Sequence, residues 1–199
     1  MSVREHITRK VLLCLDEAMP SLEKTNASFF PVDQVLDEAA RWALKTAPLH
    51  AIGPGKELPK DGLVPRKDGT GELPLPADFV RLIRFRMKGW ARPVQIPILT
   101  TDARYIQQFN PTIRGGEAKP VVALCEELGK LEYFSSSRGS GAEIAEARYF
   151  GFTDLNDDFP EKLIDVTAWK AAELVSSIMN DALAMQICAG KVAEIIQIL

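Results

Sequence analysis

A stretch rich in proline and glycine separates two helical regions of this 199-residue chain. Residues 48–76 contain six prolines and five glycines, which exclude a long helix or a long central strand. Asp61-Gly62 and Asp68-Gly69 are turn dipeptides, and Leu63-Val64 between them favours at most a weak hairpin. We therefore predict an extended, protruding loop over residues 48–76. Such a long loop in a compact domain is usually functional or disordered.

Helical periodicity marks both ends of the chain. Apolar residues recur at three- and four-residue spacing over residues 2–19 and 31–46, which predicts a helical hairpin within residues 1–47. Asp157 or Asp158, with Pro160 close behind, predicts the start of a C-terminal helical region over 157–199. Asn180 or Gly190 is the predicted break between two helices there.

Shorter elements are predicted between these regions. Alternating apolar and basic residues predict a strand over 79–90, followed by an edge strand over 92–99 and a short helix that Thr100 or Thr101 caps. A hairpin is expected from 121–126 and 131–135, and a further strand at 147–152. The predicted fold is α+β and mainly helical: a helical bundle with a small antiparallel sheet inserted at 77–152, all in one domain over residues 1–199.

Composition narrows the function classes. The net charge of −3 argues against a dedicated nucleic-acid-binding protein. Three widely spaced cysteines in apolar surroundings are expected to be buried, reduced thiols of an intracellular product. The N-terminal apolar run is too short for a signal peptide, and no window is apolar enough to span a membrane.

Residues for catalysis or ligand binding are sparse. The two histidines, His6 and His50, lack the spacing of metal ligands, and Gly139-Ser140-Gly141 lacks the Lys-Ser/Thr of a phosphate loop. An acidic cluster lies at 154–161 (Asp154, Asp157, Asp158 and Glu161), which either caps a helix or serves a small metal-dependent hydrolase. We favour the cap, and we expect no catalytic residue, no cofactor and no metal.

Two basic segments are the candidate interaction sites. On the strand at 79–90, basic residues share a face near a tryptophan, and the predicted subunit interface consists of Arg84, Arg86, Trp90 and Arg92. The alternatives are a solvated strand face and a nucleic-acid-binding module using the basic strand from Arg81 to Arg92. In the loop, contacts with a partner or a neighbouring subunit are predicted for Ile52, Lys56, Lys60, Leu63, Val64, Arg66 and Lys67.

A family resemblance is carried by the middle of the chain. The segment LPLPADFVRL, which starts at Leu73, and the segment MKGWARPV, which starts at Met87, resemble the mid-chain signature of tailed-phage head-to-tail adaptor proteins. The likeness is greatest to the adaptors of crAss-like phages. The order of elements agrees over most of the chain, including the C-terminal helical stretch with AWKAAEL from Ala168.

The resemblance implies a structural virion protein with no catalytic residues. Members of this family form a ring under the portal, which connects the phage head to the tail and extends the DNA channel. A ring of about twelve copies is implied, closed by head-to-tail contacts. The implied partners are the portal protein, other neck and tail proteins and genomic DNA, which passes without specific binding. The implied location is the virion neck after synthesis in the host cytoplasm, with no membrane contact.

Overall fold

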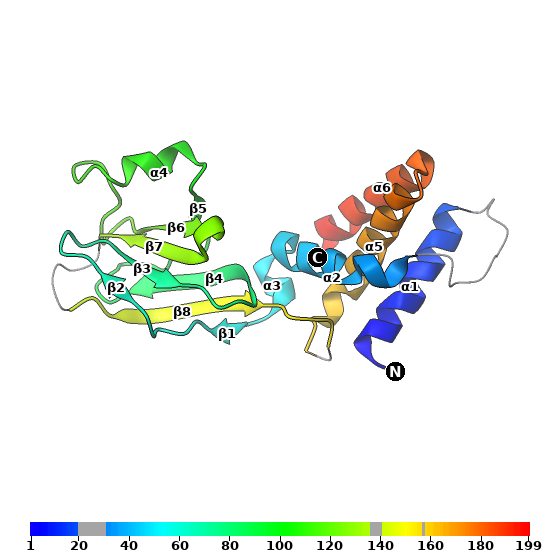
Figure 1. Ribbon diagram of the computed structural model, residues 1–199, viewed down its shortest axis with the longest axis horizontal. Helices are drawn as coiled ribbons and strands as arrows, with labels where there is room; N and C mark the ends of the chain where they lie inside the picture. The colour runs from blue at the N-terminus through cyan, green and yellow to red at the C-terminus, as the bar shows by residue number, and fades with distance from the viewer. Residues whose placement is uncertain (20–30, 136–140, 157) are drawn as a thin grey trace. The chain divides into compact units, whose positions relative to one another are not determined.

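The computed structural model describes residues 1–19, 31–135, 141–156 and 158–199 (Figure 1). The chain divides into two compact units, each with its own packing. Unit 1 comprises Met1–Gly53 and Phe152–Leu199, and unit 2 comprises Pro54–Gly151. Unit 2 is therefore an insertion between the two sequence segments that build unit 1.

Unit 1 is helical. Its described elements are α1 (Val3–Ala18), α2 (Val32–Thr46), α3 (Leu49–Ile52), a 3-10 turn (Glu161–Leu163), α5 (Ile164–Ile178) and α6 (Ala182–Ile198). Ser2 and Glu5 form a capping box at the start of α1, since each side chain bonds the other residue's backbone N–H. Helix α5 packs against α1, α2 and α6 and is thus the central helix of this unit.

Small residues bring the helices of unit 1 together. Helix α2 buries three alanines on one face, and α5 buries Ala168, Ala171 and Ala172. Alanine lets helix axes approach closely. The larger side chains of α1, such as Val11 and Leu15, are buried and fill the remaining space. The predicted helices at 2–19 and 31–46 are confirmed to within two residues. The predicted break at Asn180 is also confirmed: this residue has a φ of 56° between α5 and α6, whereas Gly190 lies inside α6.

Unit 2 contains two sheets. The strands are β1 (Lys56–Glu57), β2 (Val64–Pro65), β3 (Gly71–Pro74), β4 (Phe79–Met87), β5 (Ile98–Leu99), β6 (Val121–Cys125), β7 (Lys130–Phe134) and β8 (Ile144–Gly151). The three-stranded sheet has the order β1-β8-β4, and the five-stranded sheet has the order β2-β3-β7-β6-β5. All pairs are antiparallel except β5 with β6. The short helix α4 (Ala103–Gln107) follows the edge strand β5.

The main core of unit 2 lies between the sheets. Leu82, Phe85 and Met87 of β4 belong to the same buried cluster as Leu131 and Tyr133 of β7. A second, smaller cluster lies on the opposite face of the five-stranded sheet, where α4 contributes Tyr105; its buried members are Ile98, Ala123 and Phe134. The five-stranded sheet is therefore covered on both faces, which explains why β7 is buried along four consecutive residues.

The prediction of a mainly helical bundle with one small sheet is wrong. The structure is α+β with about 43% helix and 22% strand, and the strands form two sheets rather than one. The sequence pattern underestimated the sheets because several strands are only two to five residues long. Such strands have no periodicity of their own and exist through pairing with distant segments.

The prediction of an extended, protruding loop over 48–76 is also wrong. This stretch contains α3, β1, β2 and β3, and both Leu58 and Leu73 are buried in the main core of unit 2. The hairpin within it joins β2 to β3, and its turn includes Asp68-Gly69. Strand β3 then pairs with β7, with Leu73 opposite Leu131. The stretch is thus largely integrated into a sheet rather than protruding from it.

Two local predictions need correction. The short helix is α4, and its cap is Asp102, whose carboxylate accepts a hydrogen bond from the Arg104 N–H, rather than Thr100 or Thr101. The edge strand predicted over 92–99 is reduced to β5 and a single bridge between Val94 and Phe85. No described helix is both long and apolar enough to cross a membrane.

Candidate functional site

The predicted contact residues of the 48–76 stretch occupy different environments. Ile52 ends α3 and is buried in unit 1, and Leu63 packs against the core of unit 2. On the surface of unit 2, Lys60 and Lys67 are exposed and Val64 is half exposed. Lys56 forms an ion pair with Asp78 at 3.2 Å. The structure therefore leaves only part of this set available to a partner.

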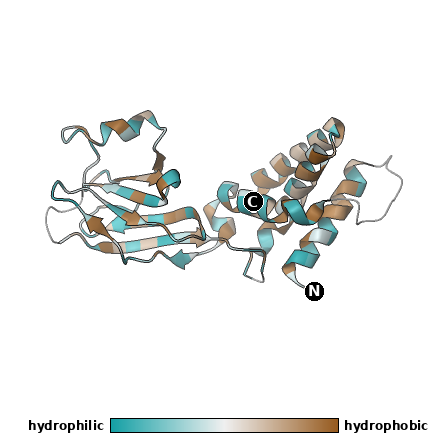
Figure 2. Cartoon of the chain, in the orientation of Figure 1, coloured by the Kyte–Doolittle hydropathy of each residue, from teal (hydrophilic) through white to brown (hydrophobic). Residues whose placement is uncertain are grey.

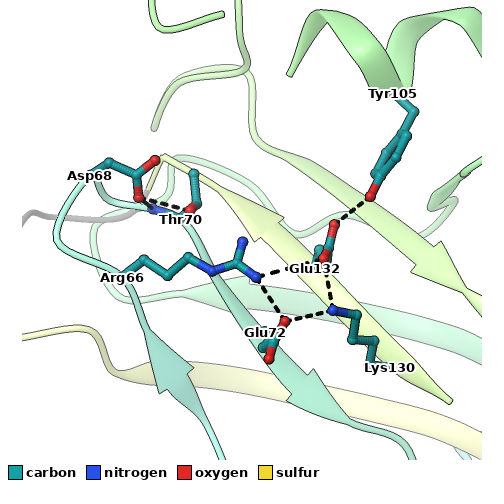
Figure 3. A network of polar contacts seen from close by, with 7 residues as sticks. All are labelled: Arg66, Asp68, Thr70, Glu72, Tyr105, Lys130 and Glu132. Atoms are coloured by element: carbon teal, nitrogen blue, oxygen red, sulfur yellow. Dashed lines mark hydrogen bonds and ion pairs between the residues drawn. The ribbon is translucent and has the colours of Figure 1, made fainter. Parts of the chain in front are cut away.

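Arg66 belongs to a polar network on the five-stranded sheet (Figure 3). Its Nη2 lies 2.8 Å from Oε2 of Glu72 and 3.8 Å from Oε1 of Glu132. Lys130 approaches the same two carboxylates, at 2.7 Å and 3.1 Å. Two cations thus alternate with two anions on one face of the paired strands β3 and β7, and the charges balance.

Glu132 is the buried centre of this network. Only 7% of its side chain is exposed, and its Oε2 accepts a hydrogen bond of 2.8 Å from the Tyr105 hydroxyl. Burial, followed by this hydrogen bond, raises the pKa of Tyr105 well above its usual value. The bond between Lys130 and Glu72 lowers the pKa of the carboxyl and raises that of the ammonium. Each charged group thus has the partners that its burial requires.

The network positions α4 on the sheet. Tyr105 starts from α4, donates to Glu132 of β7 and packs edge-to-face on Phe109, with ring centroids 5.1 Å apart. Phe109 in turn lies 6.0 Å from the Phe134 ring. Gln108, which is buried, donates to the Arg104 carbonyl and accepts from the Gly115 N–H. This short helix is therefore fixed by side-chain contacts on both sides rather than by its length.

The predicted arginine interface is only partly brought together. Arg84 and Arg86 lie on the face of β4 opposite the core, where the register places Arg148 and Glu146 of β8 beside them. Arg84 pairs with Glu146 at 3.0 Å, and Arg148 donates to the carbonyls of Pro54 and Gly55. We call these four residues the arginine face.

The other two predicted interface residues lie elsewhere. Trp90 is buried in the main core of unit 2, where its indole N–H donates to the Ser135 carbonyl at 3.0 Å. Arg92 is exposed in the loop that follows. Trp90 is therefore a core residue whose polar atom is satisfied within the chain, and it presents no ring to a partner.

The acidic cluster does not form a metal site in the described residues. Asp154 and Asp158 are exposed, and Asp157 lies outside the described residues. Helix α5 begins only at Ile164, and its preceding residue makes no side-chain cap, so the predicted cap at Asp158 is wrong. Among the described residues, no group of three or more His, Cys, Asp or Glu side chains could hold a metal ion. All three cysteines are buried and free, as predicted.

Sequence analysis missed two exposed apolar surfaces, one on each unit. The α6 surface comprises three large side chains on the outward side of α6: Leu183, Ile187 and Ile198. The α4 surface comprises five exposed side chains within residues 96–113, around β5 and α4: Ile96, Leu99, Ile106, Phe109 and Ile113. Of the residues of α6, Ala184, Cys188 and Val192 are buried.

The missed signal is in the sequence of α6. Figure 2 shows that hydrophobic residues predominate along this helix, and its only charged residues are Lys191 and Glu194. A helix that packs one face on its own chain normally carries polar residues on the other. On α6 the exposed polar residues are Gln186, Glu194 and Gln197, and the large apolar residues Leu183, Ile187 and Ile198 are exposed among them. Exposed large apolar side chains of this kind favour a second contact.

Comparisons with known proteins leave the family open. No known family model matches the chain, and no curated protein matches it significantly.

Proposed function

We propose that this protein is a structural component of a phage virion, forming a ring under the portal that connects head to tail and extends the DNA channel. The observation that carries the proposal is the presence of a separate exposed apolar surface on each unit. Large exposed apolar patches commonly mark protein–protein contacts. A ring built from identical subunits needs two different contact surfaces per chain.

The motifs between Leu73 and Val94 add support from the sequence. They fall on β3, the following turn, β4 and the loop after it, so they belong to the framework of unit 2. Leu73, Leu82, Met87 and Trp90 of these motifs are core residues. The resemblance to head-to-tail adaptors is thus a resemblance in residues that build the fold of the inserted unit.

Charge is divided unequally between the units in a way that suits a subunit contact. Unit 1 has nine basic and fifteen acidic residues, a net charge of −6. Unit 2 has fifteen basic and twelve acidic residues, a net charge of +3. Opposite net charges on two surfaces favour a defined orientation when copies associate.

The proposal is tested by electron microscopy of the purified protein, alone and mixed with purified portal rings. We expect rings with a central channel that attach coaxially to the portal. An antibody against the chain should also label the neck of intact virions. Absence of portal binding together with absence of neck labelling contradicts the proposal.

The arginine face favours a second candidate, a nucleic-acid-binding module. Three arginines against one glutamate lie on a sheet surface of the basic unit. However, Arg84 is paired with Glu146, and Arg148 is bonded to backbone carbonyls, so much of this charge is already engaged. Phosphate-driven binding predicts an affinity that falls steeply with salt, and Arg84→Gln should reduce that slope. No measurable binding at low salt dismisses this candidate.

A further inference from the structure

We infer that the α6 surface of one copy packs on the α4 surface of a second copy, so that the chain associates head to tail. This inference rests on the proposed function, because it names the two surfaces through which the proposed ring would close. It commits to a second copy of this chain as the occupant of both surfaces.

The described residues of unit 1 leave the α6 surface uncovered. Leu183 is 69% exposed and Ile198 is 83% exposed, although the same helix buries Ala184, Cys188 and Val192. Between them, Gly190 occupies a helical position where an added Cβ would meet nothing within 4 Å. Nothing in the described chain therefore requires a glycine there, and this residue leaves the surface open to close approach.

The side chains of the α4 surface are equally exposed, but the segment that carries them is fixed by contacts within unit 2. Ile96 is 82% exposed and Ile106 is 75% exposed. The Tyr105–Glu132 bond and the contact of Phe109 with Phe134 fix the segment beneath them. A held apolar surface loses little conformational entropy on binding, which favours its use as a preformed contact.

Charge complementarity favours contact between an α6 surface and an α4 surface over contact between two copies of the same surface. Residues 92–119 around the α4 surface carry four basic and two acidic groups. One of the basic groups, Arg114, is only 9% exposed and pairs with Asp68 at 3.2 Å, which leaves a net charge of +1. Residues 181–199, which contain α6 and its cap, carry two acidic groups and one basic group, a net charge of −1. The units that bear them differ in the same sense, at +3 and −6. A head-to-tail contact joins opposite charges, whereas a two-fold contact joins like charges.

The first test uses one variant for each surface and sedimentation velocity over a range of protein concentrations. Leu183→Lys places a positive charge on the acidic α6 surface, and Ile106→Glu places a negative charge on the basic α4 surface, so each change opposes both the apolar contact and the charge complementarity. Both residues are exposed, so folding should persist, and circular dichroism checks it. We expect wild-type protein to self-associate. Each variant should associate at least about tenfold more weakly. Leu128→Ser is the matched control, because Leu128 is 71% exposed and belongs to neither surface. It should associate as wild type does.

Mixing the two variants separates head-to-tail from two-fold association. The Leu183→Lys chain retains an intact α4 surface, and the Ile106→Glu chain retains an intact α6 surface. In a head-to-tail arrangement the mixture forms a heterodimer that stops at two copies, since no further intact pair remains. We expect this heterodimer, although each variant alone is monomeric.

Other outcomes overturn the inference. Dimers of the Ile106→Glu chain alone would assign the contact to α6 paired with itself, and monomeric wild-type protein at every concentration would show that no such contact forms. The result of this association test can be distinguished from the result of the test of the proposed function. Head-to-tail association without portal binding or neck labelling would retain the inference and reject the virion role.

Discussion

At the scale of single residues, Glu132 shows how a charge becomes part of an interior. Its neighbours in β7 are Leu131 and Tyr133, which point to the main core, so Glu132 lies on the other face of the sheet. That face would be solvated if α4 did not cover it. Lys130 and the Tyr105 hydroxyl supply the compensation that a buried carboxylate requires.

Replacing Glu132 with Gln should therefore destabilise unit 2. The change leaves Lys130 and Arg66 without one of their two carboxylates, and we expect a loss of about 1–3 kcal/mol in the free energy of unfolding. Urea denaturation followed by circular dichroism measures it. Glu72→Gln is the matched control at the more exposed end of the network, and it should cost less. Equal losses for the two variants would show that burial of Glu132 is not what matters.

Tyr149 gives a prediction in alkaline solution. Burial, followed by the hydrogen bond that its hydroxyl donates to Asp78, raises the pKa of Tyr149 from 10.0 to about 12. The unfolded chain therefore loses this proton at a lower pH than the folded chain. The stabilising contribution is complete below pH 10 and declines as the pH rises from 10 towards 12.

Ultraviolet titration of the folded protein should accordingly show tyrosine ionisation well above the pH of free tyrosine. Tyr149→Phe should remove part of this late transition and should flatten the decline of stability over the same pH range. Ionisation of all tyrosines near pH 10 in protein that is still folded would contradict the burial of this hydroxyl.

At the scale of elements, helix ends show where the sequence was informative and where it was not. Asp181 precedes α6 and accepts a hydrogen bond from the Ala184 N–H at 3.0 Å. Asp158, which local sequence rules favour as a cap, is followed by a turn before α5 begins. Both aspartates satisfy the same preference, and only the backbone path distinguishes them.

The two aspartates make a matched pair for mutation. Asp181→Ala should lower the free energy of unfolding by about 0.5–2 kcal/mol, because the α6 N-terminus loses its side-chain acceptor. Asp158→Ala should change it by less than about 0.5 kcal/mol, as is usual for an exposed residue without such a role. Chemical denaturation of the two variants beside wild type decides the matter, and a larger effect at Asp158 would reassign the cap.

A substitution at Gly190 should stabilise the protein, in contrast to the substitution at Asp181. It lies within α6 in a helical conformation, and a Cβ would meet no atom within 4 Å. Gly190→Ala should therefore raise the free energy of unfolding by about 0.5–1 kcal/mol, since alanine costs less backbone entropy in a helix. Thermal unfolding measured at low protein concentration, where self-association is minimal, tests this. A destabilised variant would mean that the helix is not regular at this position.

The sequence was a good guide to elements with their own periodicity. Helices α1 and α2 and the β6–β7 hairpin were predicted because their contacts are local or their apolar spacing is regular. Strands β1 and β3 were not, since each is short and pairs with a partner that is about sixty or more residues away in the chain. The α6 and α4 surfaces were not predicted for a related reason. The identity of an apolar residue does not show whether its side chain is buried or exposed.

At the scale of the whole molecule, the inserted unit has the features of an autonomous domain. Its two ends come together within one sheet, because β1 pairs with β8 and places Lys56 opposite Tyr149. Its main core draws on strands from both of its sheets. Closed ends and a separate core are the features expected of a unit that folds independently.

We therefore predict that residues 54–151 fold as an isolated fragment. Trp90 is the only tryptophan of this fragment and is buried, so its fluorescence should be shifted to shorter wavelength and should change in one cooperative transition on denaturation. The Glu132→Gln change should destabilise the fragment by the same amount as the full chain, because its partners all lie within unit 2. A fragment with the fluorescence of an exposed tryptophan would show that unit 2 needs unit 1 to fold. In that case the two units, each with one of the apolar surfaces, would have to be treated as one cooperative body.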